Sequence, residues 1–159
     1  MYLIWVVAAL SMIAGAYAMF DAESTPVPKG PSSMALAMNM SLYRQALVQF
    51  ALANPAYAGS VPAANLAPYL GGSNANPVWQ NYVLPNTNYA GSLVVVYATA
   101  ASATVAITGM EQLAQGSALA GVALGANIVS PGNPSVPLPP ALANTIPNGM
   151  PVWMAQAYD

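Results

Sequence analysis

Nineteen consecutive residues without a charge, Tyr2–Phe20 (YLIWVVAALSMIAGAYAMF), constrain this chain more than any other feature. As a helix rising about 1.5 Å per residue they would span about 28 Å, close to the hydrocarbon thickness of a bilayer. Aromatic residues near both ends resemble interfacial belts, and Asp21 and Glu23 end the run abruptly. The segment predicts an N-terminal transmembrane anchor over residues 1–20, with membrane contact through residues 2–20.

Two alternatives compete with a retained anchor. Ala16-Tyr17-Ala18 resembles an A-x-A cleavage site, which would make the segment a signal peptide. No Lys or Arg precedes the run, however, and the run is longer than a usual signal core. A buried core helix is the other alternative. We therefore favour the anchor, and we expect the following domain to lie outside the cytoplasm, although Lys29 alone would argue for the opposite orientation.

Charge is scarce, at 4% of residues, whereas about 25% is typical. Two basic residues cannot build the basic face that phosphate binding requires, so nucleic acid is excluded as a direct partner. A surface with so little charge suits a protein that sits on a membrane or inside an assembly. The charged residues are Lys29, Arg44, Asp21, Glu23, Glu111 and Asp159.

A long helix is the strongest signal after the anchor. Residues 21–31 contain three prolines and a glycine and predict a tether, which leaves 32–159 for one small domain. From Ser33 to about Asn54, large apolar side chains recur at spacings of four and three, so they share one helix face that we expect to pack on the core. They are Leu36, Met40, Tyr43, Leu47 and Phe50.

Strand signals follow the helix. The segments Val78–Leu84 and Ser92–Thr99 are rich in β-branched and aromatic residues, and Ala103–Thr108 is interpreted as a hairpin partner of the second. Residues 130–151 are rich in proline and predict a long irregular excursion with local polyproline character. Val152–Tyr158 then predicts a closing strand.

Helical and ambiguous segments complete the domain. Short helices are predicted at Ala63–Tyr69 and Gly109–Gln115. The stretch Gly116–Val129 is open between a helix and a late strand at Ala126–Val129, and its Gly121–Gly125 pair indicates close backbone packing. Together these elements predict an α+β domain in which a long helix packs on a small, mainly antiparallel sheet.

Catalytic groups are missing from the composition. The chain has no His and no Cys, so it lacks the usual general base, the thiol nucleophile and the commonest metal ligands. Only Glu111 and Asp159 could form a carboxylate pair within the domain, and Lys29 lies in the tether. We therefore expect a protein that is not an enzyme and has no cofactor or metal site.

Four residues are candidates for partner contacts. Arg44 and Glu111 are either solvated or helix-capping charges, or they pair with each other or with a partner subunit. Trp79 and Trp153 belong to a set of aromatic residues that invites a binding-patch interpretation, although core and sheet packing is the favoured role of each. The other members of that set are Tyr82 and Tyr89.

The order and texture of these segments resemble a known family. The apolar run is followed by SSMALAMNMSLYRQALVQFALANPAY, then by GSLVVVYAT, and finally by PVWMAQAY. This arrangement resembles the PilM family of type IVB (thin) pilus systems, which are found on conjugative plasmids. The resemblance implies a bacterial inner-membrane protein with a periplasmic domain that helps to assemble or anchor the pilus used in conjugation. Its implied partners are other pilus-assembly proteins and further copies of itself.

Two other functions remain open. A pilin-like subunit of the fibre would share the helix-then-sheet order, but the chain lacks the Gly followed by Phe or Met, with Glu at the fifth position, that prepilin processing requires. Asp21 and Glu23 also follow the apolar run and do not lie within it. An exported module that binds peptide or glycan through Trp79 and Trp153 is the third hypothesis.

Overall fold

The long helix α2 (Ser33–Ala53) is the first element of the computed structural model, which describes residues 33–87 and 90–158. The predicted helix is confirmed, and it ends one residue before Asn54-Pro55, where the proline restricts the preceding residue to extended backbone. All five apolar residues of its predicted stripe are buried. The predicted membrane anchor at residues 1–20 lies outside the described residues.

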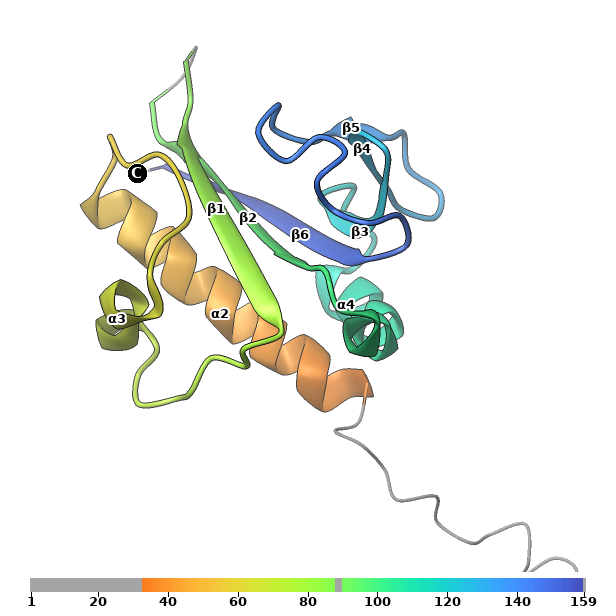
Figure 1. Cartoon of the computed structure of the whole chain (residues 1–159), viewed down its shortest axis with the longest axis horizontal. Helices are drawn as coiled ribbons and strands as arrows, with labels where there is room; N and C mark the ends of the chain where they lie inside the picture. Colours follow the sequence, from red (N-terminus) through yellow and green to blue (C-terminus); the bar gives the residue numbers. More distant parts are fainter. Residues whose placement is uncertain (1–32, 88–89, 159) are drawn as a thin grey trace, which may run out of the picture. The chain divides into compact units, whose positions relative to one another are not determined.

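A six-stranded sheet, antiparallel throughout, forms the centre of the domain (Figure 1). The strand order is β1-β2-β6-β3-β4-β5, so the last strand of the chain is inserted between the two hairpins. The α+β class and the antiparallel sheet are therefore confirmed. The strands are β1 (Trp79–Pro85), β2 (Ser92–Ala98), β3 (Ala120–Leu124), β4 (Asn127–Val129), β5 (Val136–Pro137) and β6 (Pro151–Ala157).

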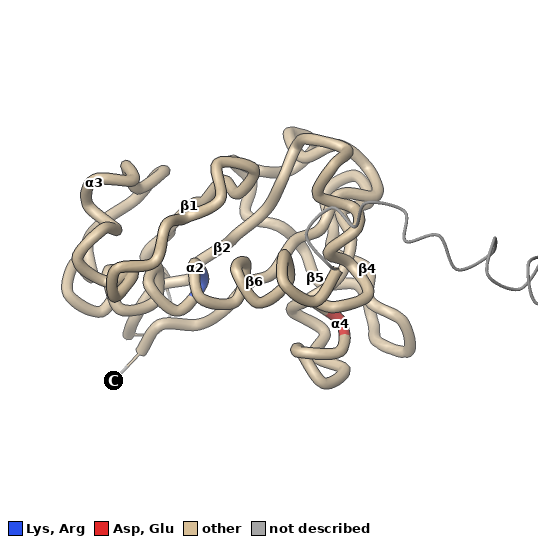
Figure 2. The backbone as a smooth tube through the Cα atoms, turned by 90° about the horizontal axis from the view of Figure 1, so that it is seen from below, with Lys and Arg blue, Asp and Glu red and all other residues tan. Residues whose placement is uncertain are grey.

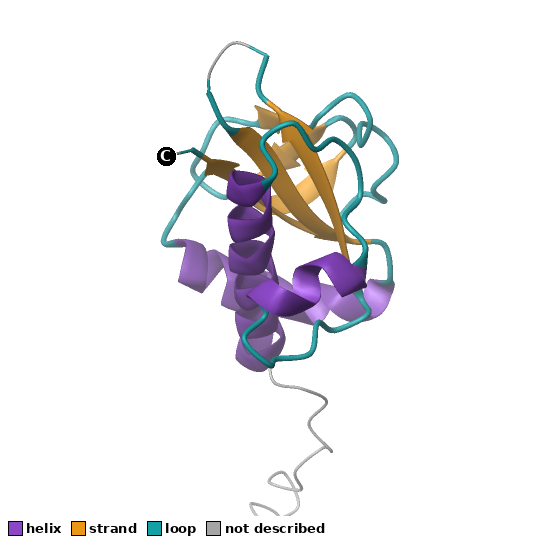
Figure 3. Ribbon diagram, turned by 90° about the vertical axis from the view of Figure 1, so that its left-hand side faces the viewer, coloured by secondary structure: helices purple, strands orange, loops and turns teal. Residues whose placement is uncertain are grey.

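Helices cover one face of this sheet (Figure 3). Helix α2 packs on β2 and β6, and α4 (Ile107–Ala114) packs against α2 and β3. The side chains between these layers come from alternate strand positions, such as Val94, Val96 and Ala98 of β2. This is the alternation that a pleated strand imposes, because successive side chains point to opposite faces.

The proline-rich excursion covers the opposite face. Leu138, Leu142 and Ile146 pack there against strand residues such as Val95 and Val152, and all of them are buried. The predicted irregular structure of residues 130–151 is confirmed, apart from the two-residue strand β5 and Pro151, which begins β6. Because both faces of the sheet are covered, β6 is buried at six of its seven positions and reads as an apolar run.

One predicted strand is wrong. Ala103–Thr108 does not pair with β2, since it forms most of the 3-10 helix η2 (Ala101–Ala106) and the start of α4. Ala103, Ala106 and Met110 are buried at helical spacings of three and four, and these outweigh the β-branched residues between them. The strand beside β2 is β6.

The remaining predictions are largely confirmed. Ala63–Tyr69 forms the short helices α3 (Ala63–Leu66) and η1 (Ala67–Tyr69), and α4 covers most of the predicted helix at Gly109–Gln115. The ambiguous segment 116–129 forms β3 and β4, so its helical alternative is wrong.

Gly121 and Gly125 explain why the β3–β4 hairpin can form. A Cβ at Gly121 would lie 2.2 Å from the carbonyl oxygen of Val129, so no other residue fits without backbone movement. Gly125 has φ 59° at the first position of the two-residue turn, where hairpins favour glycine. The predicted close backbone packing is confirmed at Gly121.

Hydropathy gives no candidate span elsewhere. Within residues 33–87 and 90–158, no helix combines the length and apolar character that crossing a membrane requires.

Candidate functional site

Arg44 lies in the middle of α2 and reaches across to β6. Its guanidinium carbon stands 4.3 Å from the centre of the Trp153 ring, within the range of a cation–π contact. The flat guanidinium can stack on an indole in this way, whereas a lysine ammonium would be held less specifically. Arg44 is neither a helix cap nor a freely solvated charge, because it is half-buried on an aromatic surface.

The environment of Arg44 is unusually poor in partners. Its Nε atom is buried, and no hydrogen-bond partner for it exists among the described residues. Burial also lowers the pKa of Arg44 from its ordinary value, because desolvation disfavours the charged form. An arginine nevertheless stays protonated at neutral pH. The site therefore contains a desolvated cation whose hydrogen-bonding capacity is not fully used within the described chain.

Two hollows meet at Arg44. One has a volume of about 410 Å³ and lies between α2, the end of α4 and β6, where Trp153, Gln156 and Tyr158 contribute to its wall. The other, about 390 Å³, follows α2 along Gln45 and Gln49 to the same strand.

Glu111 lies beside a third, smaller hollow of about 140 Å³. This hollow adjoins the first, because Ala114 and Ser117 line both. We call the three adjoining hollows the Arg44 groove. Arg44 and Glu111 are the only charged residues in the described part of the chain, and both line this groove.

Pairing of Arg44 with Glu111, one of the alternatives that the sequence leaves open, is not seen among the described residues. Figure 2 shows the blue segment on α2 and the red segment on α4 apart from each other, and no ion pair joins them in the described part of the chain. The two charges line different hollows, which share Ala114 and Ser117 as lining residues. Pairing of either charge with a partner subunit stays a prediction.

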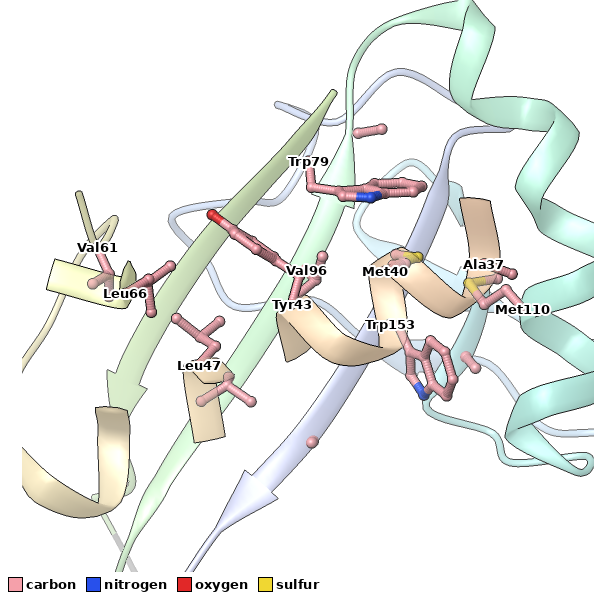
Figure 4. Packing of buried hydrophobic residues seen from close by; sticks show 14 of the residues in the cluster. Ala37, Met40, Tyr43, Leu47, Val61, Leu66, Trp79, Val96, Met110 and Trp153 are labelled. Carbon is pink, nitrogen blue, oxygen red and sulfur yellow. The ribbon is translucent and has the colours of Figure 1, made fainter. Parts of the chain in front are cut away.

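The two predicted tryptophans pack in the core, as the favoured interpretation held. Trp79 and Trp153 expose only 4% and 3% of their surfaces, and Figure 4 shows their indoles to either side of Met40. The Trp79 indole N–H donates to Asn39 Oδ1 at 3.0 Å, so the ring is fixed inside the domain and is not a contact surface. Trp153 is different because it also forms the floor beneath Arg44.

The other two aromatic candidates, Tyr82 and Tyr89, add no contact to this site among the described residues. Tyr82 is half-buried on the excursion-covered face, and Tyr89 lies outside the described residues. Gln156 and Tyr158 also line the groove, and the sequence does not predict them as site residues. Nothing in their local sequence marks them, because their position depends on the register of β6 against β2 and β3.

The charged group that dominates the groove is suited to binding. Arg44 donates hydrogen bonds but does not release its proton, and Glu111 is held in a separate hollow. A guanidinium on an aromatic floor recognises planar anions, above all carboxylates.

Comparison with known proteins decides the family. The PilM family model matches residues 8–154, which is most of the chain. The chain belongs to the PilM family. No curated protein and no solved structure matches it. Membership in the PilM family connects the chain with pilus and conjugation systems, and the resemblance seen in the sequence is confirmed.

Proposed function

We propose that this PilM-family protein is a non-catalytic structural component of a type IV pilus assembly apparatus, anchored in the bacterial inner membrane. The observation that carries the proposal is the extent of the family match, which includes the apolar run from residue 8 as well as the domain. In this proposal residues 1–20 span the membrane, 21–31 form the tether, and 32–159 form a domain in the periplasm. Its partners are other pilus-assembly proteins and further copies of itself.

Composition supports a role without catalysis. The chain has no His or Cys, and its two described charges lie in separate hollows. Such a domain can hold partners through apolar and amide-rich surfaces but has little means of moving protons. The scarcity of charge also suits a surface that is covered in an assembly.

The first experiment is intact mass and membrane fractionation of the protein expressed with its native neighbours. We expect a full-length chain from Met1 that remains in the inner membrane and cross-links to pilus-assembly proteins. A chain shortened by about the first eighteen residues and released from the membrane would overturn the anchor. Its recovery in sheared pili would then favour the pilin-like alternative.

A matched pair of variants isolates the anchor. Leu10→Arg places a charge near the centre of the apolar run, where an Arg opposes insertion by about 2.5–3.5 kcal/mol and a Leu favours it. Val27→Arg adds the same charge in the tether. We expect only the first variant to leave the membrane fraction. Equal retention of both would contradict a membrane span over residues 2–20.

A further inference from the structure

The two outer edges of the sheet are closed to additional strands. On β1, Val83 exchanges backbone hydrogen bonds of 2.8 and 2.9 Å with Gly59, and the side chain of Asn81 binds the backbone N–H and C=O of Val61. On the opposite edge, β5 has only two residues, and Pro137 has no N–H to donate. Short, proline-containing or covered edges are the usual protection against unwanted pairing.

One internal edge is open. On its β3 side, β6 is paired only through residues 151–153, and the last bond runs from Met154 N–H to Leu119 C=O at 2.8 Å. On its other side, β6 stays paired with β2 as far as Ala157. In an antiparallel ladder the bonding side alternates between successive residues. The N–H and C=O of Gln156 therefore point the same way as those of Met154, toward the side where β3 has ended.

This open edge forms one wall of the Arg44 groove. Gln156 lines both hollows beside Arg44, and α2 forms the opposite wall through Gln45 and Gln49. A strand laid along β6 would pass directly between a sheet edge and a helix. Its alternate side chains would then face the apolar hollow, where Leu113 and Leu119 line the wall together with Trp153.

The positive charge of Arg44 indicates which side chain an added strand should carry. Arg44 has a buried, unpartnered Nε and is the only cation in the described chain. A carboxylate would satisfy it, since a guanidinium binds carboxylates with paired, charge-assisted hydrogen bonds. Glu111, the only acid among the described residues, is held in α4 and lines a different hollow from Arg44.

We propose that the Arg44 groove binds an extended, acidic segment of another protein, which adds as a strand to β6 at Gln156 and places a carboxylate on Arg44. The groove offers the two features that strand-addition sites use: a free strand edge, whose backbone pairing gives affinity, and hollows for side chains, which give specificity. This inference rests on the proposed function, in which the domain holds other assembly proteins, and it names the chemistry of the partner.

The test uses the full-length chain in detergent and a library of random nonapeptides displayed on phage. We expect the selected sequences to share an Asp or Glu within an apolar, β-branched context. A synthetic peptide of that sequence should lose about tenfold or more in affinity when its acid becomes an amide, and equally when Arg44→Gln is introduced. The two changes together should cost no more than either alone, because both remove the same contact.

Backbone pairing is tested separately with a matched pair of variants. Gln156→Pro removes the outward N–H, whereas Gln156→Ala removes only the side chain and keeps it. The paired residues on the β2 side, Ala155 and Ala157, are unchanged in both. We expect Gln156→Pro to weaken the peptide about tenfold and Gln156→Ala to leave the affinity nearly unchanged, with near-ultraviolet circular dichroism confirming that both variants fold. N-methylation of alternate amides of the peptide should weaken its binding only at those amides whose N–H pairs with β6.

Each contrary outcome is decisive. Selected peptides without acids, or binding that Arg44→Gln leaves intact, would overturn the carboxylate assignment. Equal affinities of the two Gln156 variants would overturn strand addition. Binding of synthetic peptides from this chain, residues 21–31 or 150–159, at the affinity of the selected peptide would replace the other protein by a second copy. None of these results depends on membrane retention, so failure of the anchor and failure of the groove are distinguishable.

Discussion

The two faces of the sheet are covered in different ways. On one face, α2 and α4 bury residues such as Met40 and Leu47 in regular layers. On the other face, Leu138, Leu142 and Ile146 come from an excursion without regular structure beyond β5. Side chains are fully buried on both faces, so an irregular chain can exclude water as completely as a helix.

The helices and the excursion differ in how rigidly their side chains are held against the sheet. A helix fixes its side chains through its own backbone hydrogen bonds, whereas a loop depends on a few local turns. The excursion is secured by bonds such as Gly149 N–H to Ala123 C=O and Leu138 N–H to Ala126 C=O, both 2.8 Å. We therefore expect equal damage to the two faces to have unequal consequences.

The largest effect should come from core truncation. Leu47→Ala removes a fully buried side chain on the helix-covered face and should lower the free energy of unfolding by about 4 kcal/mol. Ile146→Ala, on the excursion-covered face, should cost only about 2 kcal/mol, because a loop can collapse into part of the cavity. Urea unfolding of the full chain, followed by tryptophan fluorescence, measures both.

A conservative control checks that cavity volume is responsible. Ile146→Val should cost about 1 kcal/mol, since it removes a single methylene. Equal losses for Leu47→Ala and Ile146→Ala would show that the excursion is as rigid as the helical layer.

The cover of the helix-covered face could be predicted from the sequence more fully than that of the other face, because only the helix has a regular periodicity. Helical periodicity identified α2 and its buried stripe directly, because every fourth or third residue is large and apolar. The excursion was recognised only as irregular, and nothing in its composition indicates which of its residues pack on the sheet. The composition of Ala103–Thr108 predicts a strand although the segment is helical, since short apolar segments do not distinguish a helix from a strand.

The candidate site was predicted in part. Arg44, Glu111 and Trp153 stood out because charges and tryptophans are rare in this chain. That they line one groove depends on contacts between α2, α4 and β6, which lie far apart in the sequence. Gln156 could not be found from the sequence, because its open backbone follows from where β3 stops pairing.

The next effect concerns two glycines at close backbone approaches. Gly121→Ala would place a Cβ 2.2 Å from the carbonyl oxygen of Val129, between β3 and β4, and should cost about 3 kcal/mol. Gly109→Ala would place a Cβ 2.8 Å from the carbonyl oxygen of Ser33, between α4 and α2 on the helix-covered face. It should cost about 1 kcal/mol, because the first turn of α2 can shift.

Thermal unfolding of the two alanine variants ranks these contacts, and Gly132→Ala controls for the change of residue type. A Cβ at Gly132 meets nothing within 4 Å, although its φ of 76° adds strain. If Gly109→Ala proved more destabilising than Gly121→Ala, the helical layer would be the less adaptable of the two contacts.

Buried polar groups should give a smaller difference. Asn81 is buried within β1, where its side chain binds Val61 through two bonds and Tyr43 through a third. Asn81→Ala leaves these groups without partners and should cost about 2 kcal/mol. Ser130→Ala removes two long bonds of 3.4 Å, one donated to the Ser117 carbonyl and one accepted from the Asn133 side chain, and should cost less than about 1 kcal/mol.

The comparison is made by urea unfolding at neutral pH, with Asn81→Asp as a third variant. The carboxylate would keep the bond from the Val61 N–H but place a charge in a buried position, so it should destabilise more than alanine. A neutral effect of Asn81→Ala would mean that water replaces the lost bonds at this edge.

The smallest expected effect is a loss of stability at alkaline pH, to which one buried tyrosine on each face contributes. Burial raises the pKa of Tyr43 on the helix-covered face, partly offset by its hydrogen bond with Asn81, and burial also raises the pKa of Tyr97 on the opposite face. A raised pKa in the native state means that the unfolded chain loses the phenolic proton first. Stability is therefore fully present below the ordinary tyrosine pKa of about 10 and declines as pH rises through and beyond it.

Phenylalanine variants assign this decline to one face or the other. Tyr43→Phe should lose about 1 kcal/mol at neutral pH, because Asn81 loses a bond of 2.7 Å, whereas Tyr97→Phe should lose less. Both variants should then lose less additional stability than the parent chain between about pH 9 and pH 11, since one shifted group is gone. Urea midpoints measured across that interval test the expectation. An unchanged pH slope in Tyr97→Phe would place the alkaline sensitivity on the helix-covered face alone, where the tyrosine is held by a polar partner as well as by burial.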